Sequence, residues 1–228
     1  MNRTNEPGTG NRENLAGRLL VATTNRHKVR EIFGVLAGIS YELTTLDDWP
    51  GLPAPPEDAP GFIENARAKA LYYAQSTGAL TVAEDSGLEI DALGGAPGVG
   101  SARFGGPRAS YPDRFELIYA ALRAKGASGS AARFVCAVVL ADRRRILFET
   151  TAAIEGCLAP EPRGSAGFGY DPIFLHPPDQ RTLGEMSPAE KAAISHRGQA
   201  FRALRRFLDS GRPPSHDRNP PEGEAQEP

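Results

Sequence analysis

The sequence predicts an α/β protein built on a mixed β-sheet. The apolar run 19–23 passes directly into a helical pattern over 28–36, as a strand followed by a helix does. The apolar and β-branched stretches 133–141 and 146–154 instead flank a short polar turn, which is the pattern of a β-hairpin. Strands thus occur both with and without crossover helices, so we expect parallel and antiparallel pairs in one sheet.

The stretch before the hairpin is predicted to add one helix and two strands. Residues 61–76 carry apolar side chains at helical spacing. The short apolar run 80–83 is typical of a buried strand, and it leads into Glu-Asp-Ser-Gly, where we expect a turn. Residues 88–93 then alternate between apolar and acidic side chains, as a half-exposed strand does.

Two further helices are expected in the remaining chain. Residues 111–125 have the periodicity of an amphipathic helix. Ser187, Pro188 and Glu190 supply a cap, a helix-starting proline and a capping-box glutamate, so a last helical run begins here. We expect that run to break near Gly198.

The chain of 228 residues is long enough to bury a core without a metal or a disulfide. Its two ends are polar and rich in Gly, Pro, Asn and Glu, so residues 1–17 and 211–228 are predicted to be disordered tails. Between them, residues 18–210 contain no repeat and no long linker. This body is predicted to be the single functional domain.

Charge and cysteine usage limit the classes of partner. Lys and Arg total 26 against 28 for Asp and Glu, which gives no sign of a nucleic-acid-binding surface. The apolar run 134–141 is far shorter than the roughly 20 residues that span a bilayer. Cys136 and Cys157 lie in apolar stretches, as small buried thiols of a reduced protein do. We expect a cytoplasmic protein with a small-molecule substrate and neither a nucleic-acid nor a membrane partner.

A strand-to-helix junction at residues 23–28 is the first candidate site. Backbone N–H groups at the start of a helix favour an anion. Lys28 lies where the helix dipole disfavours a cation by about 0.3 to 1 kcal/mol, so its presence suggests that an anion joins it. The alternative is an ordinary surface turn with a solvated lysine.

An acidic pair follows the apolar run 80–83. Glu84 and Asp85 are expected at the carboxyl end of a strand, where open α/β sheets place their ligand sites. A carboxylate there can hold magnesium or take a proton from water. The alternative is an acid that caps the turn at Ser86 and Gly87.

A proline-rich loop and the helix after it offer further polar groups. Glu57 lies in the loop, and Asn65 and Lys69 are one helical turn apart on one face. If that face lines the cleft, an acid, a carboxamide and an ammonium meet the same substrate. The alternative is a solvated helix face, which we prefer for Glu64.

A glycine-flanked aromatic and a late basic cluster could bind a nucleobase. In the string 167–172, Phe168 could stack on a purine, while the following proline is expected to hold Asp171 extended. Lys191 and the run 195–197 could clamp a phosphate or a purine carbonyl. The alternatives are a packing aromatic in a turn and a mixed-charge exposed helix.

Taken together, these strings resemble the Ham1/RdgB family of non-canonical purine nucleoside triphosphate pyrophosphatases. The matches run in order from Leu20 to Arg197, most of the predicted domain. They are T-T-N-R-H-K at 23–28, E-D-A-P-G-F-I-E-N-A at 57–66, E-D-S-G-L at 84–88, G-G-A-P-G-V-G-S-A-R-F at 94–104, G-F-G-Y-D-P-I-F at 167–174, E-M-S-P-A-E-K at 185–191 and I-S-H-R-G-Q-A at 194–200.

The resemblance implies a fold, an activity and a cofactor. The fold would be elongated and two-lobed, with helices flanking a long mixed sheet and the active-site cleft between the lobes. The reaction would cleave ITP, dITP and XTP to the monophosphate and pyrophosphate, which keeps these nucleotides out of DNA and RNA. One magnesium ion per subunit and a homodimer are also expected.

The resemblance also implies roles for individual residues. Asp85 would be the general base and a magnesium ligand, Glu57 the other metal-binding acid and Lys69 a catalytic lysine near the phosphates. The triphosphate would be held by Thr23, Thr24, Asn25, Arg26, His27 and Lys28, with a further substrate contact from Ser86. The base and sugar would be surrounded by Phe168, Gly169, Tyr170, Asp171, Lys191, His196 and Arg197.

Two positions depart from the family pattern, and two other functions compete. Thr24 stands where the family usually has glycine, and Glu84 stands where it usually has aspartate. These changes could alter the approach to phosphate and the surroundings of the metal. One competing function is a house-cleaning pyrophosphatase for modified pyrimidine nucleotides, as in Maf-like proteins. The other is a nucleotide-binding regulator that has lost catalysis.

Overall fold

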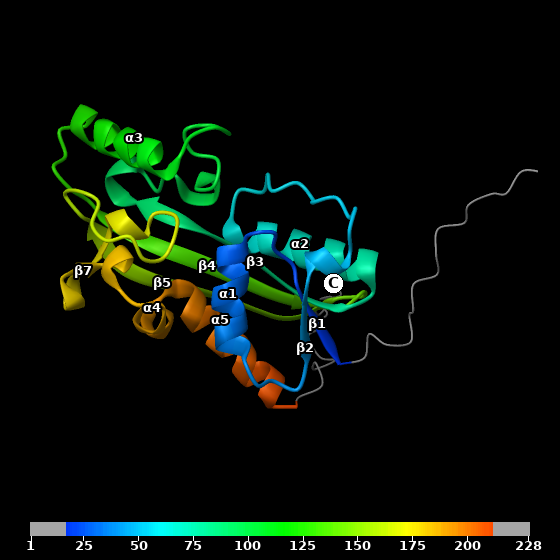
Figure 1. The fold of residues 1–228 in the computed structure, drawn as a ribbon. Coiled ribbons are helices and arrows are strands. Elements are labelled where there is room, and N and C mark those ends of the chain that lie inside the picture. The colour runs from blue at the N-terminus through cyan, green and yellow to red at the C-terminus, as the bar shows by residue number, and fades with distance from the viewer. Residues whose placement is uncertain (1–16, 212–228) are drawn as a thin grey trace, which may run out of the picture.

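The computed structural model describes residues 17–211, and its centre is one open, mixed sheet of seven strands in the order β2-β1-β3-β4-β5-β6-β7 (Figure 1). The strands are β1 Arg18–Val21, β2 Glu42–Thr45, β3 Leu80–Ile90, β4 Ala131–Ala141, β5 Ile146–Leu158, β6 Phe174–His176 and β7 Arg181–Thr182. β1 pairs in parallel with both β2 and β3, and every later pair is antiparallel. The prediction of a mixed sheet is confirmed.

Five α-helices accompany the sheet in the described part of the chain. They are α1 Arg26–Leu36, α2 Phe62–Thr77, α3 Tyr111–Ala124, α4 Pro188–Ile194 and α5 His196–Asp209. Asn25 caps α1, and capping boxes start α3 and α4, the latter through Ser187 and Glu190 as predicted. None of these helices is both long and apolar enough to cross a bilayer.

Helices cover both faces of the sheet near its centre. On one face, the alanines of α2 pack against Ala83 and Val139. On the other, α1 and α5 pack against Val82 and Val138. Because successive strand residues point to opposite faces, neighbouring positions of β3 and β4 supply these two cores in turn.

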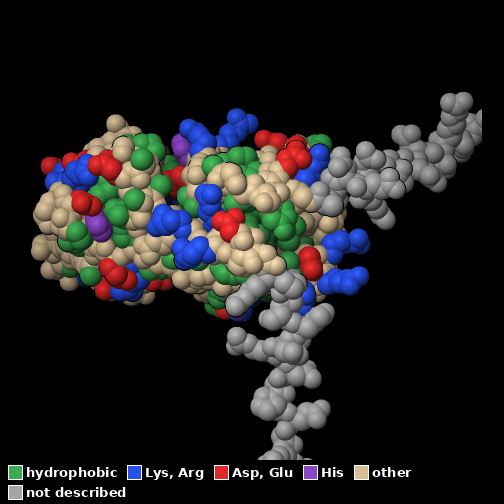
Figure 2. Space-filling view, turned by 90° about the horizontal axis from the view of Figure 1, so that it is seen from below, with side chains coloured by type: hydrophobic (Ala, Val, Ile, Leu, Met, Phe, Trp, Pro, Cys, Tyr) green, Lys and Arg blue, Asp and Glu red, His purple; other side chains and the backbone are tan. Residues whose placement is uncertain are grey.

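A third core lies toward the other end of the long strands. There, Leu88, Phe134 and Phe174 pack with Phe115 and Ile118 of α3. The strands β3, β4 and β5 run through both ends, so the molecule is elongated with two lobes (Figure 1). The surface in Figure 2 intersperses basic and acidic side chains, in keeping with a net charge of -2.

Two predicted chain breaks are wrong or displaced. No turn occurs at Ser86 and Gly87, because β3 runs unbroken from Leu80 to Ile90. Gly87 is needed for close approach instead, since a Cβ there would clash with the carbonyl oxygen of Gly98. The last helical run breaks at Ser195, which caps α5, and not at Gly198. Apart from Gly17 and Gly211, the predicted tails lie outside the described residues.

Candidate active site

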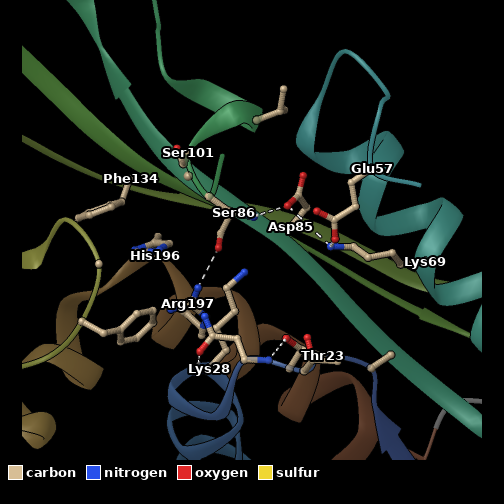
Figure 3. A pocket seen from close by; sticks show the side chains of 18 of the residues that line it. Thr23, Lys28, Glu57, Lys69, Asp85, Ser86, Ser101, Phe134, His196 and Arg197 are labelled. Carbon is tan, nitrogen blue, oxygen red and sulfur yellow. Dashed lines mark hydrogen bonds and ion pairs between the residues drawn. The ribbon is translucent and has the colours of Figure 1, made fainter. Parts of the chain in front are cut away.

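A cavity between the two lobes gathers most of the residues predicted to act on substrate (Figure 3). It lies where the chain leaves β1 beside the middle of β3, and the amide of Ala22 donates to the Val82 carbonyl 2.8 Å away. The predicted residues that line it are Thr23, Thr24, Asn25, Lys28, Glu57, Lys69, Asp85, Ser86, Phe168, Gly169, Tyr170, Asp171, Lys191, His196 and Arg197. Arg26 and His27 do not line this cavity.

The strand-to-helix junction is tightly organised by its own side chains. Asn25 Oδ1 accepts the amides of His27 at 2.9 Å and Lys28 at 3.3 Å, and Thr23 Oγ1 accepts the amide of Asn25 at 3.2 Å. Two amides of the first turn are therefore satisfied within the chain. Lys28 turns inward to Glu84, with 2.5 Å between Nζ and Oε1, so the alternative of a solvated surface lysine is wrong.

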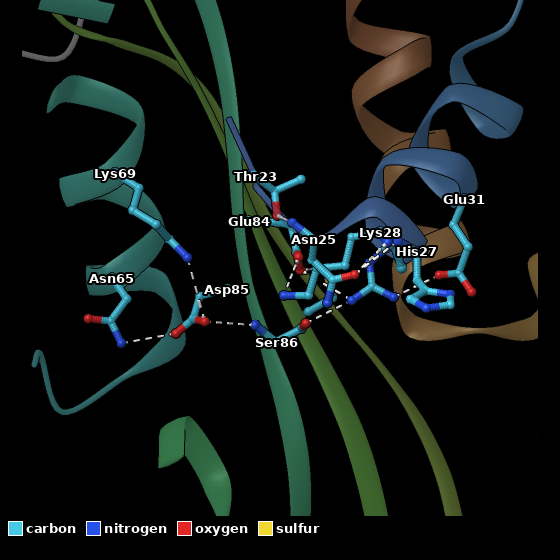
Figure 4. Close-up of polar contacts among 12 residues, drawn as sticks. Thr23, Asn25, His27, Lys28, Glu31, Asn65, Lys69, Glu84, Asp85 and Ser86 are labelled. Carbon is cyan, nitrogen blue, oxygen red and sulfur yellow. Dashed lines mark hydrogen bonds and ion pairs between the residues drawn. The ribbon is translucent and has the colours of Figure 1, made fainter. Parts of the chain in front are cut away.

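The two acids of β3 point to opposite sides of the strand (Figure 4). Asp85 faces α2, where Asn65 Nδ2 donates to Oδ2 at 2.9 Å and Lys69 Nζ lies 3.7 Å from Oδ1. Glu84 faces α1 and α5, and contacts Lys28 and Arg197. Neither acid caps a turn, so that alternative is wrong.

These surroundings set the protonation of the two acids differently. Burial would raise the pKa of Glu84, but the charges of Lys28, Arg197 and Lys69 hold it well below its ordinary value. Burial raises the pKa of Asp85, and Lys69 and Asn65 only partly oppose this effect. Asp85 is thus the better proton acceptor of the two.

Lys69 lies between the two acids predicted to bind metal. Its Nζ is 2.8 Å from Glu57 Oε1 as well as 3.7 Å from Asp85 Oδ1. Across residues 17–211, no three acidic, histidine or cysteine side chains form a ready-made metal cluster. Magnesium commonly takes only one or two protein carboxylates and completes its shell with water and phosphate, so this pair fits it.

Arg103 is a contributor that the sequence did not single out. Its guanidinium donates to the backbone oxygen of Glu57 at 3.0 Å and lies 3.6 Å from the Glu57 carboxylate. It therefore fixes the proline-rich loop against the segment after β3. Its place in the motif at 94–104 was the one available signal. Glu64 is exposed, as expected.

The glycine-flanked loop brings one aromatic and one acid to the cavity. Asp171 is buried, and its Oδ2 accepts the amide of Phe168 at 2.7 Å and Lys191 Nζ at 2.5 Å. The expectation that Asp171 is extended is wrong, because it begins the short helix η5 Asp171–Ile173. Tyr170 is largely a core residue, and its hydroxyl donates to the Ser101 carbonyl at 2.8 Å.

The late basic cluster is buried, so the alternative of an exposed mixed-charge helix is wrong. Arg197 donates to Ser86 Oγ at 2.8 Å and to Glu31 at 2.7 Å, and Lys191 lies 2.8 Å from Glu31. Glu31 of α1 thus positions both cations. The sequence did not single it out, because it lies 166 residues from Arg197.

His196 occupies an apolar position at the edge of the same cluster. Its ring stacks on Phe134 with centroids 4.8 Å apart and 12° between the planes. Burial, followed by the charges of Arg197 and Lys191, lowers the pKa of His196 well below its ordinary value. The imidazole is therefore neutral at physiological pH, and its buried Nδ1 has no hydrogen-bond partner among the described residues.

The sequence matches the model of one known family over nearly the whole described chain. The model of the Ham1 family matches residues 19–207. The chain belongs to the Ham1 family. The resemblance seen in the sequence motifs is confirmed.

Several named Ham1 relatives are similar over most of their length. A protein from Thermus thermophilus named dITP/XTP pyrophosphatase is 45% identical over 199 residues, which cover 86% of this chain and 94% of the relative. A protein from an Exiguobacterium species with the same name is 43% identical over 187 residues, covering 82% and 94% respectively.

Solved Ham1 structures share the fold. A HAM1 protein from Coxiella burnetii superposes with a TM-score of 0.79 at 38% identity, covering 85% of this chain and 99% of its own. A protein from Mycobacterium abscessus described as a nucleoside-triphosphatase or dITP/XTP pyrophosphatase gives 0.64 at 39% identity, covering 82% and 98%. The predicted elongated α/β fold is confirmed.

The two departures from the family pattern are accommodated locally. The backbone at Thr24 does not have the positive φ that favours glycine, so a side chain causes no backbone strain there. Among the described non-glycine residues, only Gln180 has a positive φ. Glu84 is long enough to reach Lys28 while its other oxygen accepts the Cys136 thiol at 3.3 Å.

Proposed function

We propose that this chain hydrolyses non-canonical purine nucleoside triphosphates, namely ITP, dITP and XTP, to the monophosphate and pyrophosphate. The observation that carries the proposal is Asp85, a buried residue that lines the cavity, has a raised pKa and is held between Asn65 and Lys69. The names of the Ham1 relatives support the substrate class. Clearing these nucleotides would keep them out of DNA and RNA.

Asp85 is the proton acceptor of the reaction. A water molecule gives its proton to the carboxylate while its oxygen attacks the α-phosphorus. The bond between the α-phosphorus and the bridging oxygen breaks, and pyrophosphate leaves with that oxygen. Asn65 donates to one oxygen of this carboxylate and the backbone amide of Ser86 donates to the other at 3.1 Å, so the orientation of the carboxylate is fixed.

Two lysines are placed to stabilise the leaving pyrophosphate. Burial disfavours the charge of Lys69, but Asp85 and Glu57 raise its pKa above the ordinary value, so it stays cationic. Lys28 approaches from the other side of β3. Positive groups fixed where negative charge develops lower the barrier without reorganisation.

Glu57 and Asp85 are the residues that would hold one magnesium ion per subunit. A bound ion of this kind supplies charge neutralisation to the triphosphate. Lys69 already bridges these carboxylates by its charge, so the pair is spaced to share a cation. Arg103 keeps Glu57 facing the cavity through its bond to the loop backbone.

Selection of the base rests on the groups around Phe168. Its ring is half-buried at the cavity, and Lys191 Nζ lies 4.5 Å from the ring centroid. Lys191 and Arg197 are donors, and a 6-oxo purine offers an acceptor where adenine offers an amino group. A hypoxanthine or xanthine ring stacked on Phe168 could therefore satisfy these cations.

Pyrophosphate release from ITP, dITP and XTP, beside ATP, GTP, CTP and UTP, tests the substrate class. The first three should be cleaved fastest, and only with magnesium present. Equal rates on all purine substrates would refute the selectivity, and faster cleavage of the pyrimidine nucleotides would favour the Maf-like alternative. Nucleotide binding without any turnover would favour the non-catalytic regulator.

We also propose that two copies of the chain pair and that the enzyme works in the cytoplasm on free nucleotides. Both free cysteines, Cys136 and Cys157, are compatible with a reducing compartment. Light scattering after size-exclusion chromatography measures the mass directly. A value of one chain mass would refute the dimer.

A further inference from the structure

His27, like Arg26, is set apart from the residues of the strand-to-helix junction that line the active-site cavity. Thr23, Thr24, Asn25 and Lys28 line the active-site cavity, whereas His27 lies in a neighbouring groove between α1, α4 and α5. Its backbone amide is taken by the Asn25 cap. Its exposed imidazole stacks on the ring of Phe168, with centroids 5.1 Å apart and 21° between the planes.

Phe168 belongs to the wall that the two spaces share, as Lys191 does. It lines both the cavity and the groove, whereas His27 lines only the groove. The imidazole therefore supports the ring from the side away from the cavity. The chain neighbours of Phe168 cannot support its ring, because Gly167 and Gly169, both with positive φ, have no side chains.

We propose that His27 is a positioning residue for base recognition, and that it acts by backing Phe168 rather than by holding phosphate. A purine stacked on the cavity side of the ring then completes a three-layer stack of base, phenyl and imidazole. The imidazole layer of this stack belongs to α1, and Lys28 lies in the same first turn of that helix. This role rests on the proposed hydrolysis of purine triphosphates.

The role predicts a specific kinetic signature. The free energy of one stacked aromatic pair corresponds to about a 2- to 12-fold change in a binding constant. His27→Ala should therefore raise the KM for ITP by about that factor. The kcat should change little, because the contacts of His27 are with Asn25 through its amide and with Phe168 through its ring, and not with Asp85, Lys69 or Glu57.

Three comparisons separate base positioning from a phosphate role. His27→Phe should restore the KM, because it keeps an aromatic ring without a charge. Arg30→Ala is the matched control, since it removes an exposed basic side chain one turn away in the same groove. Inorganic tripolyphosphate, which has no base, should inhibit His27→Ala and the unmodified protein equally.

The experiment measures kcat and KM for ITP, with the inhibition constant of tripolyphosphate, in all four proteins. An unchanged KM in His27→Ala overturns the inference, as does a His27→Phe variant that is equally impaired. Weaker tripolyphosphate inhibition that matches the rise in KM assigns His27 to phosphate and also overturns it. Absence of pyrophosphate release by the unmodified protein refutes the proposed function and this role with it.

Discussion

Replacement of Glu84 with glutamine is expected to destabilise the fold strongly. The Glu84 side chain is only 1% exposed, and its carboxylate lies 2.5 Å from Lys28 Nζ and 3.5 Å from Arg197. Glutamine keeps the size but removes the charge. Loss of one partner of a buried ion pair costs about 3 to 5 kcal/mol. Arg197 retains Glu31, so we expect the lower end, about 3 kcal/mol of unfolding free energy.

Urea denaturation followed by circular dichroism measures this loss, with an unchanged m-value as the sign of two comparable transitions. Glu149→Gln is the matched control, because Glu149 pairs with Arg67 at 2.7 Å but is 40% exposed. Exposed pairs contribute about 0 to 1 kcal/mol, so the control should change little. Equal losses in the two variants, or a loss below about 1 kcal/mol for Glu84→Gln, would refute the reasoning.

The effect of Glu84→Gln on the unfolding free energy should depend on pH. The pKa of Glu84 in the folded protein is well below the ordinary value of 4.5. The stability that its charge contributes is therefore complete above about pH 4.5 and is lost as the pH falls through the lowered folded value. The gap in unfolding free energy between the unmodified protein and Glu84→Gln should shrink on acidification. A gap that widens below that pH would contradict the assignment.

The other predictions concern catalysis and packing. Asp85→Asn should lower kcat for ITP by about 100- to 10,000-fold while ITP still binds in calorimetry; near-normal turnover would place the base elsewhere. Removal of divalent cations with a chelator should abolish pyrophosphate release, and added magnesium should restore it. Glu57→Gln should raise the magnesium concentration needed for the half-maximal rate. Glu31→Gln should lower the ITP-to-ATP ratio of kcat/KM, because it removes one of the two carboxylates that hold Lys191, the other being Asp171; an unchanged ratio counts against that positioning. Gly87→Ala should cost about 1 to 3 kcal/mol in thermal unfolding, since its methyl group meets the Gly98 carbonyl.

Features governed by local pattern could be predicted from the sequence. The boundaries of α2 and of the β4–β5 hairpin lie close to the expected ones, because periodicity and turn residues report on nearby chain. The junction at residues 23–28 was also foreseen. The unbroken course of β3 through Gly87 was not foreseen, because a glycine needed for close approach looks the same in sequence as a glycine needed for a turn.

Contacts between distant segments were beyond the reach of spacing alone. The structure alone reveals the roles of Glu31 and Arg103 and the inward direction of Lys28. These contacts form because the fold brings α1, α5 and the proline-rich loop together around β3. The motifs drew attention to the right strings, but they could not say which acid met which base. The opposite placement of Glu84 and Asp85 followed from strand geometry once the strand was known to continue.

The uninterrupted course of β3 makes its length as important as its composition. Glu84 and Asp85 lie in different environments because successive residues of a strand point to opposite faces of the sheet. One inserted or deleted residue ahead of them would exchange their faces, sending the proton acceptor toward Lys28 and the anchoring acid toward Lys69. Insertion or deletion of a single residue in this strand should therefore be more damaging than most substitutions within it.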